Sequence, residues 1–256
     1  MLDATAITLQ LGRREVLRGL DFAARPGSVT AIAGPNGSGK TTLMRVLTGE
    51  LPLPGRVRLN GQDVARISPG RLAGLRAVLP QAVHVAFPFT LREIVAMGHE
   101  AGDAAGQDGV VAAALSAVDL TDKAQRPLPE LSGGEQQRGH LARALAQVWE
   151  PVGPAGPRWL FLDEPVAALD IAHQLQVLRH ARAFADAGGG VVAVMHDLNL
   201  TAMFADRLVL MSEGRVLAAG SPAEVLNDAL LERTYGCRLR ANVVPLQHPF
   251  VLPQTV

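Results

Sequence analysis

Short apolar runs alternate along the chain with longer segments that have helical periodicity. Runs without polar interruption are typical of parallel strands that are buried on both faces of a sheet. Five of them stand out: Val29–Ala33, Ala77–Leu79, Trp159–Asp163, Val191–Met195 and Leu208–Met211, the third ending in an acid. Helical patterns occupy residues 110–119, 135–149, 171–186 and 222–231. This alternation predicts a layered α/β fold.

Local signals mark where some of these elements begin. Thr90 and Glu93 have the spacing of a capping box, and Ser221 and Glu224 form a second one with proline at the first helical position. The stretch Val16–Phe22 predicts an antiparallel strand in an N-terminal subdomain.

The order of the elements predicts one domain over residues 1–256. We expect a core from residues 1–81 and 151–235, because these contain the predicted parallel strands. Residues 82–150 are mostly helical and predict an inserted helical subdomain, and residues 236–256 form a C-terminal tail.

Composition narrows the classes of function. The chain has 24 Lys and Arg against 24 Asp and Glu, so a general nucleic-acid partner is disfavoured. The single cysteine, Cys237, excludes an intrachain disulfide and favours a reducing compartment. No signal peptide and no apolar stretch of about 20 residues is recognisable. We therefore expect a protein that is soluble or attached to a membrane through a partner.

Residues Gly34–Thr41 match the phosphate-loop pattern G-x-x-x-x-G-K-S/T between a predicted strand and a predicted helix. Glycines let successive N–H groups face an anion, and the helix adds its positive end. Lys40 is placed to reach the β and γ phosphates and Thr41 to bind Mg²⁺. The alternative, a glycine-rich turn with an incidental lysine, is disfavoured because eight positions fit. The expected nucleotide-binding residues are Gly34, Asn36, Gly37, Ser38, Gly39, Lys40, Thr41 and Thr42.

Polar residues end two of the predicted strands, at the sheet edge where α/β proteins bind ligands. Asp163 suits Mg²⁺, and Glu164 suits orienting or deprotonating a water molecule in line with the γ phosphate. We expect them to differ in role because adjacent strand residues point to opposite faces. His196 can hydrogen-bond the γ phosphate or that water. Alone, each feature would be explained better by an ordinary strand end. Beside a phosphate loop, that alternative is disfavoured for the two acids.

The segment Leu131–Arg138 contains a capping box between Ser132 and Glu135, and also two consecutive glycines that a capping box does not need. Together with the phosphate loop, it resembles the signature of ABC-type ATPases. The resemblance covers about residues 5–235 with all motifs in order. Gln81 matches the family's Q-loop, Ala168–Asp170 its D-loop and His196 its switch histidine.

This resemblance implies an ABC ATPase fold with a P-loop NTPase core, and a head-to-tail homodimer. Each ATP would lie between the phosphate loop of one chain and Ser132, Gly133 and Gly134 of the other, with Asp170 at the seam. Gln81 would sense Mg²⁺ and nucleotide and relay to a membrane subunit. Val83–Thr90 would lie near the surface that couples to it.

Three positions depart from the family pattern. The stretch Leu11–Val16 holds no aromatic residue to stack on adenine, so Leu11 or Val16 is expected to make an apolar contact instead. Glu135 stands where glutamine is common, and Val166-Ala167 replaces a common Thr-Ser pair.

The stretch His196–Ala202 resembles ATPases that serve iron-siderophore, haem and cobalamin importers. The proline-rich insertion before Trp159 and the tail segment Gln247–Pro253 are similar to the haem importer branch. The resemblance implies an ATPase on the cytoplasmic face of the inner membrane, with two permease subunits and, indirectly, a periplasmic or surface substrate-binding protein. It implies neither nucleic-acid binding nor direct haem contact.

Other functions remain as alternatives. A ferric-siderophore or cobalamin importer ATPase is the nearest one. A soluble ABC ATPase of DNA repair or translation is more distant, because such proteins usually have coiled-coil arms, tandem units or basic linkers. A small-molecule P-loop kinase would have no use for Leu131–Glu135.

Overall fold

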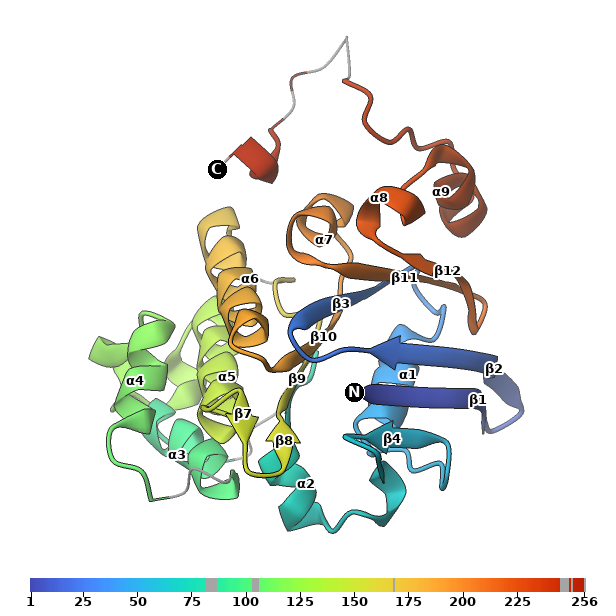
Figure 1. Ribbon diagram of the computed structural model, residues 1–256. Helices are drawn as coiled ribbons and strands as arrows, with labels where there is room; N and C mark the ends of the chain where they lie inside the picture. The colour runs from blue at the N-terminus through green and yellow to red at the C-terminus, as the bar shows by residue number, and fades with distance from the viewer. Residues whose placement is uncertain (82–86, 103–105, 168, 245–248, 250, 256) are drawn as a thin grey trace.

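A six-stranded sheet forms the centre of the computed structural model, which describes residues 1–81, 87–102, 106–167, 169–244, 249 and 251–255 (Figure 1). Its strand order is β12-β11-β3-β10-β9-β6, with β12 antiparallel and the others parallel. The strands are β3 (Ser28–Ala33), β6 (Arg76–Leu79), β9 (Trp159–Asp163), β10 (Gly190–Val194), β11 (Arg207–Ser212) and β12 (Arg215–Gly220). All five predicted strands, and the α/β class, are confirmed.

The sheet is buried on both faces, which explains its continuous apolar runs. Along β9, Trp159 and Phe161 belong to one hydrophobic core, while Leu160 and Leu162 belong to the other. All four side chains are fully buried. Burying a large apolar side chain stabilises the fold by about 1.5–3 kcal/mol. Because the side chains of β9 alternate between the two cores, this strand contributes such energy to both.

An N-terminal antiparallel sheet covers one face, and it confirms the strand predicted at Val16–Phe22. Its strands are β1 (Leu2–Leu11), β2 (Arg14–Ala24), β4 (Val57–Leu59) and β5 (Gln62–Asp63). The same core includes buried residues of α1 (Lys40–Leu47) and α2 (Pro69–Leu75).

Helices cover the other face (Figure 1). They are α5 (Gly133–Gln147), α6 (Ile171–Asp186), α7 (Leu198–Phe204), α8 (Pro222–Val225) and α9 (Asp228–Tyr235). Helices α3 (Leu91–Ala101) and α4 (Val110–Ala117) pack against the outer side of α5. The proline-rich segment before Trp159 forms a short hairpin of β7 (Val152–Gly153) and β8 (Gly156–Pro157). Within the described ranges, no helix combines the length and the apolarity needed to cross a membrane.

The single helix predicted at residues 222–231 is wrong, because two short helices occupy this segment. Helix α8 ends at Val225, and the side chain of Asn227 accepts a hydrogen bond from the Leu230 N–H at 3.0 Å. Asn227 thereby caps a new helix, α9. The capping box at Thr90 and Glu93 is present as expected.

Candidate functional site

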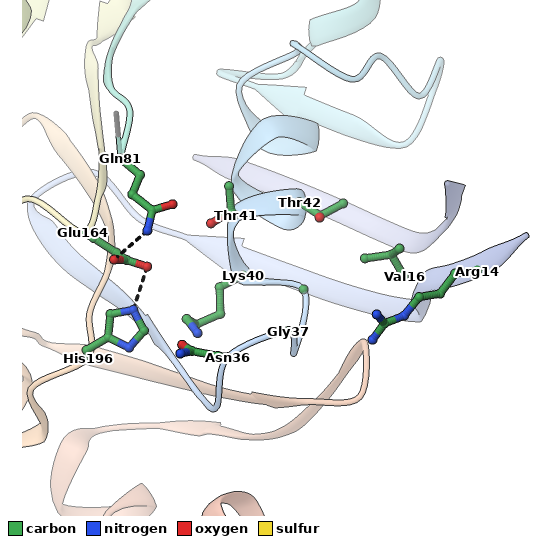
Figure 2. A pocket seen from close by; sticks show the side chains of 11 residues that line it. Arg14, Val16, Asn36, Gly37, Lys40, Thr41, Thr42, Gln81, Glu164 and His196 are labelled. Atoms are coloured by element: carbon green, nitrogen blue, oxygen red, sulfur yellow. Dashed lines mark hydrogen bonds and ion pairs between the residues drawn. The ribbon is translucent and has the colours of Figure 1, made fainter. Parts of the chain in front are cut away.

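A cleft of about 580 Å³ opens at the carboxyl ends of the parallel strands (Figure 2). Four parallel strands lead into it, because the phosphate loop follows β3, Gln81 follows β6, Glu164 follows β9 and His196 follows β10. Strand β2 of the antiparallel sheet adds Arg14 and Val16. The lining residues are Arg14, Val16, Asn36, Gly37, Gly39, Lys40, Thr41, Thr42, Gln81, Glu164 and His196. The topology thus brings together side chains that are up to 182 positions apart, from Arg14 to His196.

The phosphate loop closes tightly on its own lysine. The Lys40 ammonium donates hydrogen bonds to the carbonyls of Gly34, at 2.9 Å, and Pro35, at 3.0 Å. Burial lowers the pKa of the Lys40 amine, and the negative charges of Glu164 and Asp163 oppose that shift. The loop therefore holds a largely buried cation at the N-terminus of α1, where an anionic ligand would bind.

Gly34 is required by the packing of this loop. Its φ is +149°, and a Cβ atom there would lie 2.1 Å from the carbonyl oxygen of Met211 on β11. We expect Gly34→Ala to displace the loop and to lower the free energy of unfolding by about 1–3 kcal/mol. Chemical denaturation measures this. Gly70→Ala is the control, because a Cβ at Gly70 would meet nothing within 4 Å. Equal stability of the two variants would contradict the steric argument.

Asp163 and Thr41 form a small group of oxygen atoms behind the loop. The Thr41 hydroxyl donates to Asp163 at 3.4 Å, and Asp163 is 4% exposed. Burial is the main cause that raises the pKa of the Asp163 carboxyl, although the Thr41 hydrogen bond opposes it. A hard cation would offset this desolvation, and carboxylate and hydroxyl oxygens are ligands that Mg²⁺ accepts. The residues present therefore fit a magnesium ion.

Glu164 is the centre of the polar contacts in the cleft. Its carboxylate accepts a hydrogen bond from the Gln81 amide at 2.9 Å, and its other oxygen lies 2.6 Å from Nε2 of His196. The Glu164 side chain is 15% exposed, against 43% for His196. Figure 2 shows the three side chains converging at one end of the cleft. This arrangement aims a carboxylate with two fixed partners into a space open to ligand.

Asp163 and Glu164 point in different directions, but not because adjacent residues of a strand alternate between its faces, as we expected. Asp163 is the last residue of β9, but Glu164 lies beyond the strand with a φ of +53°. Strand alternation therefore does not apply to Glu164; a left-handed backbone turns it into the cleft. Such a conformation costs about 1–3 kcal/mol in a residue other than glycine, so surrounding contacts must hold it.

Five predicted site residues outside the phosphate loop are absent from the described lining of the cleft: Ser132, Gly133, Gly134, Asp170 and Asp163, which lies behind the loop. Ser132 begins α5, where its N–H donates to Glu135 at 2.8 Å. The ammonium of Lys123 contacts the same carboxylate and is the largest cause that lowers the pKa of Glu135 to about 2. Asp170 begins α6 and accepts a hydrogen bond from the His173 N–H at 3.0 Å.

Two further predicted loop residues also lie outside the cleft lining. The Gly34 carbonyl holds Lys40, as described above. Ser38 is buried and lines an adjoining cavity of about 450 Å³, which shares Asn36 and Gly37 with the main cleft.

Sequence reasoning missed Arg14. It lines the cleft together with Val16, whereas Leu11, which we also considered as a contact for the base, is not among the described lining residues. Figure 2 shows Arg14 and Val16 beyond the phosphate loop, at the end away from Glu164. Its position in the chain could have indicated this role, because Arg14 lies within Leu11–Val16, the stretch expected to contact the adenine base.

Some predicted features fall outside the described residues. They are residues 83–86 of the predicted coupling surface, Ala168 of the D-loop match, and residues 247, 248 and 250 of the tail segment. The described part of the coupling surface contains Phe87, which is 67% exposed. Its ring packs edge-on against Phe89, with the centroids 6.1 Å apart.

Comparisons with known protein families and with individual proteins agree with each other. The family model described as ABC transporter matches residues 17–167. The chain is 58% identical to the hemin import ATP-binding protein HmuV of Roseobacter denitrificans, over 98% of this chain and 97% of that protein. It is 51% identical to the protein of the same name from Mesorhizobium japonicum, over 100% and 99%.

Solved structures show the same fold. The ATP-binding subunit of an ABC transporter superposes with a TM-score of 0.77 at 22% identity, over 93% of this chain and 94% of that chain. An ATP-binding cassette of an ABC transporter in its ADP conformation superposes with a TM-score of 0.75 at 25% identity, over 91% and 97%.

Proposed function

Because the chain belongs to the ABC transporter family of ATP-binding proteins, we propose that it is the ATP-hydrolysing subunit of an importer whose solute is haem. The observation that supports the ATPase activity is that Lys40, Glu164 and His196 line the same cleft. The name hemin import ATP-binding protein, borne by relatives 51–58% identical to this chain, supports haem as the solute.

ATP binding would use the loop and the start of α1. Lys40 would exchange its two carbonyl partners for phosphate oxygens of ATP, and backbone N–H groups of Gly37 and Gly39 would face the same phosphates. Charge-assisted hydrogen bonds of this kind are about twice as strong as neutral ones. Thr41, Asp163 and Gln81 would hold Mg²⁺, which when bound supplies positive charge to the β and γ phosphates.

Hydrolysis would depend on Glu164. Its carboxylate accepts a proton from a water molecule as the water oxygen bonds to the γ phosphorus and the bond to the ADP oxygen breaks. The hydrogen bonds from Gln81 and with His196 fix the direction of the carboxylate. His196 is more exposed than Glu164 and is within reach of a γ phosphate or the attacking water.

A head-to-tail homodimer would complete each site. Ser132, Gly133 and Gly134 begin α5 outside the cleft of their own chain. The Ser132 N–H is bound to Glu135, so the first-turn N–H groups of Gly133 and Gly134 are the donors that would approach a phosphate bound to a second copy. Asp170 begins α6 in the same way. In the domain division predicted from the sequence, Ser132–Gly134 belong to the helical unit, residues 82–150, and Asp170 belongs to the core.

We expect Ser132→Arg to lower ATP hydrolysis by the assembled transporter by about 100-fold, the order of effect of removing a transition-state donor. ATP binding by a single chain should not change, because Ser132 does not line its cleft. A phosphate-release assay and a nucleotide-binding titration measure the two effects.

Ser221→Arg is the matched control for that variant. Ser221 also caps a helix, and the N–H of Ser221 donates to Glu224 at 2.8 Å. Both substitutions lose a cap, at about 1 kcal/mol, but only Ser132 stands at the proposed dimer seam. Wild-type hydrolysis in Ser132→Arg would rule out the role across the dimer.

The proposed assembly contains two permease subunits and, indirectly, a periplasmic or surface substrate-binding protein. The ATPase would attach from the cytoplasmic face, without touching haem. The exposed Phe87 follows Gln81 by six residues and packs on the partly buried Phe89, which supports a coupling surface there.

Transport of several solutes side by side tests the proposal. The chain would be reconstituted in liposomes with its permease and binding protein, and ATP-dependent uptake of haem, cobalamin and a ferric siderophore would be measured. Uptake of haem alone is expected. Uptake of another solute would overturn haem but keep the ATPase role, and no ATP hydrolysis would overturn both.

A further inference from the structure

Gln137, in the second turn of α5, contacts the backbone of Glu164. Its side-chain amide nitrogen donates to the Glu164 carbonyl at 3.1 Å. A carbonyl only accepts hydrogen bonds, so the nitrogen of the amide must face it. The amide oxygen of Gln137 is buried and has no hydrogen-bond partner among the described residues. Among the described residues, this is the hydrogen bond that orients the side chain.

With that contact, both the N–H and the carbonyl of Glu164, the residue with the left-handed backbone, are hydrogen-bonded. The N–H of Glu164 donates to the Val194 carbonyl on β10 at 3.2 Å, and the Glu164 carbonyl accepts from Gln137 and, at 3.4 Å, from the Ala167 N–H. With φ at +53°, Glu164 depends on such contacts to keep its conformation. Leaving this left-handed conformation would reorient the Cα–Cβ bond of Glu164 and move the carboxylate away from Gln81 and His196.

Gln137 is also linked to the first turn of α5. It follows Gly133 and Gly134 by four and three residues, so it lies on the same face of the helix, one turn further on. A displacement of this turn, such as binding of a phosphate at Ser132–Gly134 would produce, would move the donor that holds Glu164.

We propose that Gln137 is a positioning residue that couples the first turn of α5 to the direction of the Glu164 carboxylate. This inference rests on the proposed function, because it presumes that Glu164 acts on water. It adds a connection within one chain between the helix start that faces a second copy and the base of its own site.

Gln137→Met tests the inference, because methionine has nearly the same length and no donor. We expect kcat for ATP hydrolysis by the reconstituted transporter to fall by about 10- to 100-fold, the cost of a misplaced reacting group, with KM unchanged within about twofold. Gln137→Asn, one methylene too short to reach, should show the same split, so the test stands if the first variant fails to fold. Gln176→Met is the control: its amide donates to the Ala117 carbonyl at 3.3 Å, away from the cleft.

A double-mutant cycle separates positioning from general stability. In a Glu164→Gln background, Gln137→Met should lower the residual hydrolysis no further, because the base it positions is gone. An equal loss in both backgrounds, a higher KM with unchanged kcat, or wild-type kcat would overturn the inference. A wild-type transporter without ATP hydrolysis would overturn the proposed function instead.

Discussion

Glu164→Gln should lower ATP turnover by the reconstituted transporter by about 10²–10⁴-fold, the usual contribution of a positioned base. The amide keeps the shape of the side chain but cannot accept the proton of the attacking water. ATP affinity should persist, because Lys40 and the loop N–H groups remain. The variant should therefore accumulate as an ATP-bound dimer, which gel filtration with and without ATP would detect.

Glu100→Gln is the control for the loss of a negative charge, since Glu100 is exposed near the end of α3, outside the cleft. It should hydrolyse ATP like the wild type. If Glu164→Gln also kept turnover within a few fold of the wild type, Glu164 would not be the base.

Lys40→Ala should weaken ATP binding by about 10- to 100-fold, since a hydrogen bond to a charged group contributes about 1.5–3 kcal/mol and each 1.4 kcal/mol is a factor of ten. The two carbonyls that now accept from Lys40 would also lose their donor. Hydrolysis should fall further than binding, because the ammonium also stabilises charge on the transferring phosphoryl group. Titration with a fluorescent ATP analogue measures the first effect.

Arg45→Ala is the control in the same helix. Arg45 is exposed and pairs with Glu50 at 3.2 Å, so its loss removes a positive charge from α1 without touching the cleft. Unchanged ATP affinity in Lys40→Ala would remove the phosphate-binding role of Lys40.

The parallel sheet could be predicted from the sequence because both of its faces are buried, which leaves continuous apolar runs in strands such as β9. The antiparallel strand β1 was harder to predict. Its register shifts between Ala4 and Ile7, where Ala6 adopts a φ of +47°, and this breaks the alternation that marks a half-buried strand. Helix α2 is not predicted from the sequence, because it begins with Pro69-Gly70, a pair typical of turns.

The candidate site was predictable where a local motif carries it, as in the phosphate loop. The conformation of Glu164 was not, because it precedes Pro165, and the residue before proline is biased toward extended backbone. Contacts with β10 and α5 override that bias. Arg14 was missed for a related reason: an exposed arginine is usually solvated, and only the folded chain brings it beside the loop.

The chain has two lysines among its 24 basic residues, Lys40 in the phosphate loop and Lys123 against the Glu135 that caps α5. Acylation of lysine side chains therefore labels two places only, and these are the two surfaces that the proposed dimer would bring together. Lys40 lines the cleft, so bound ATP would shield its amine from the reagent. Mass spectrometry of the two acylated peptides would thus report nucleotide occupancy at one surface and closure at the other.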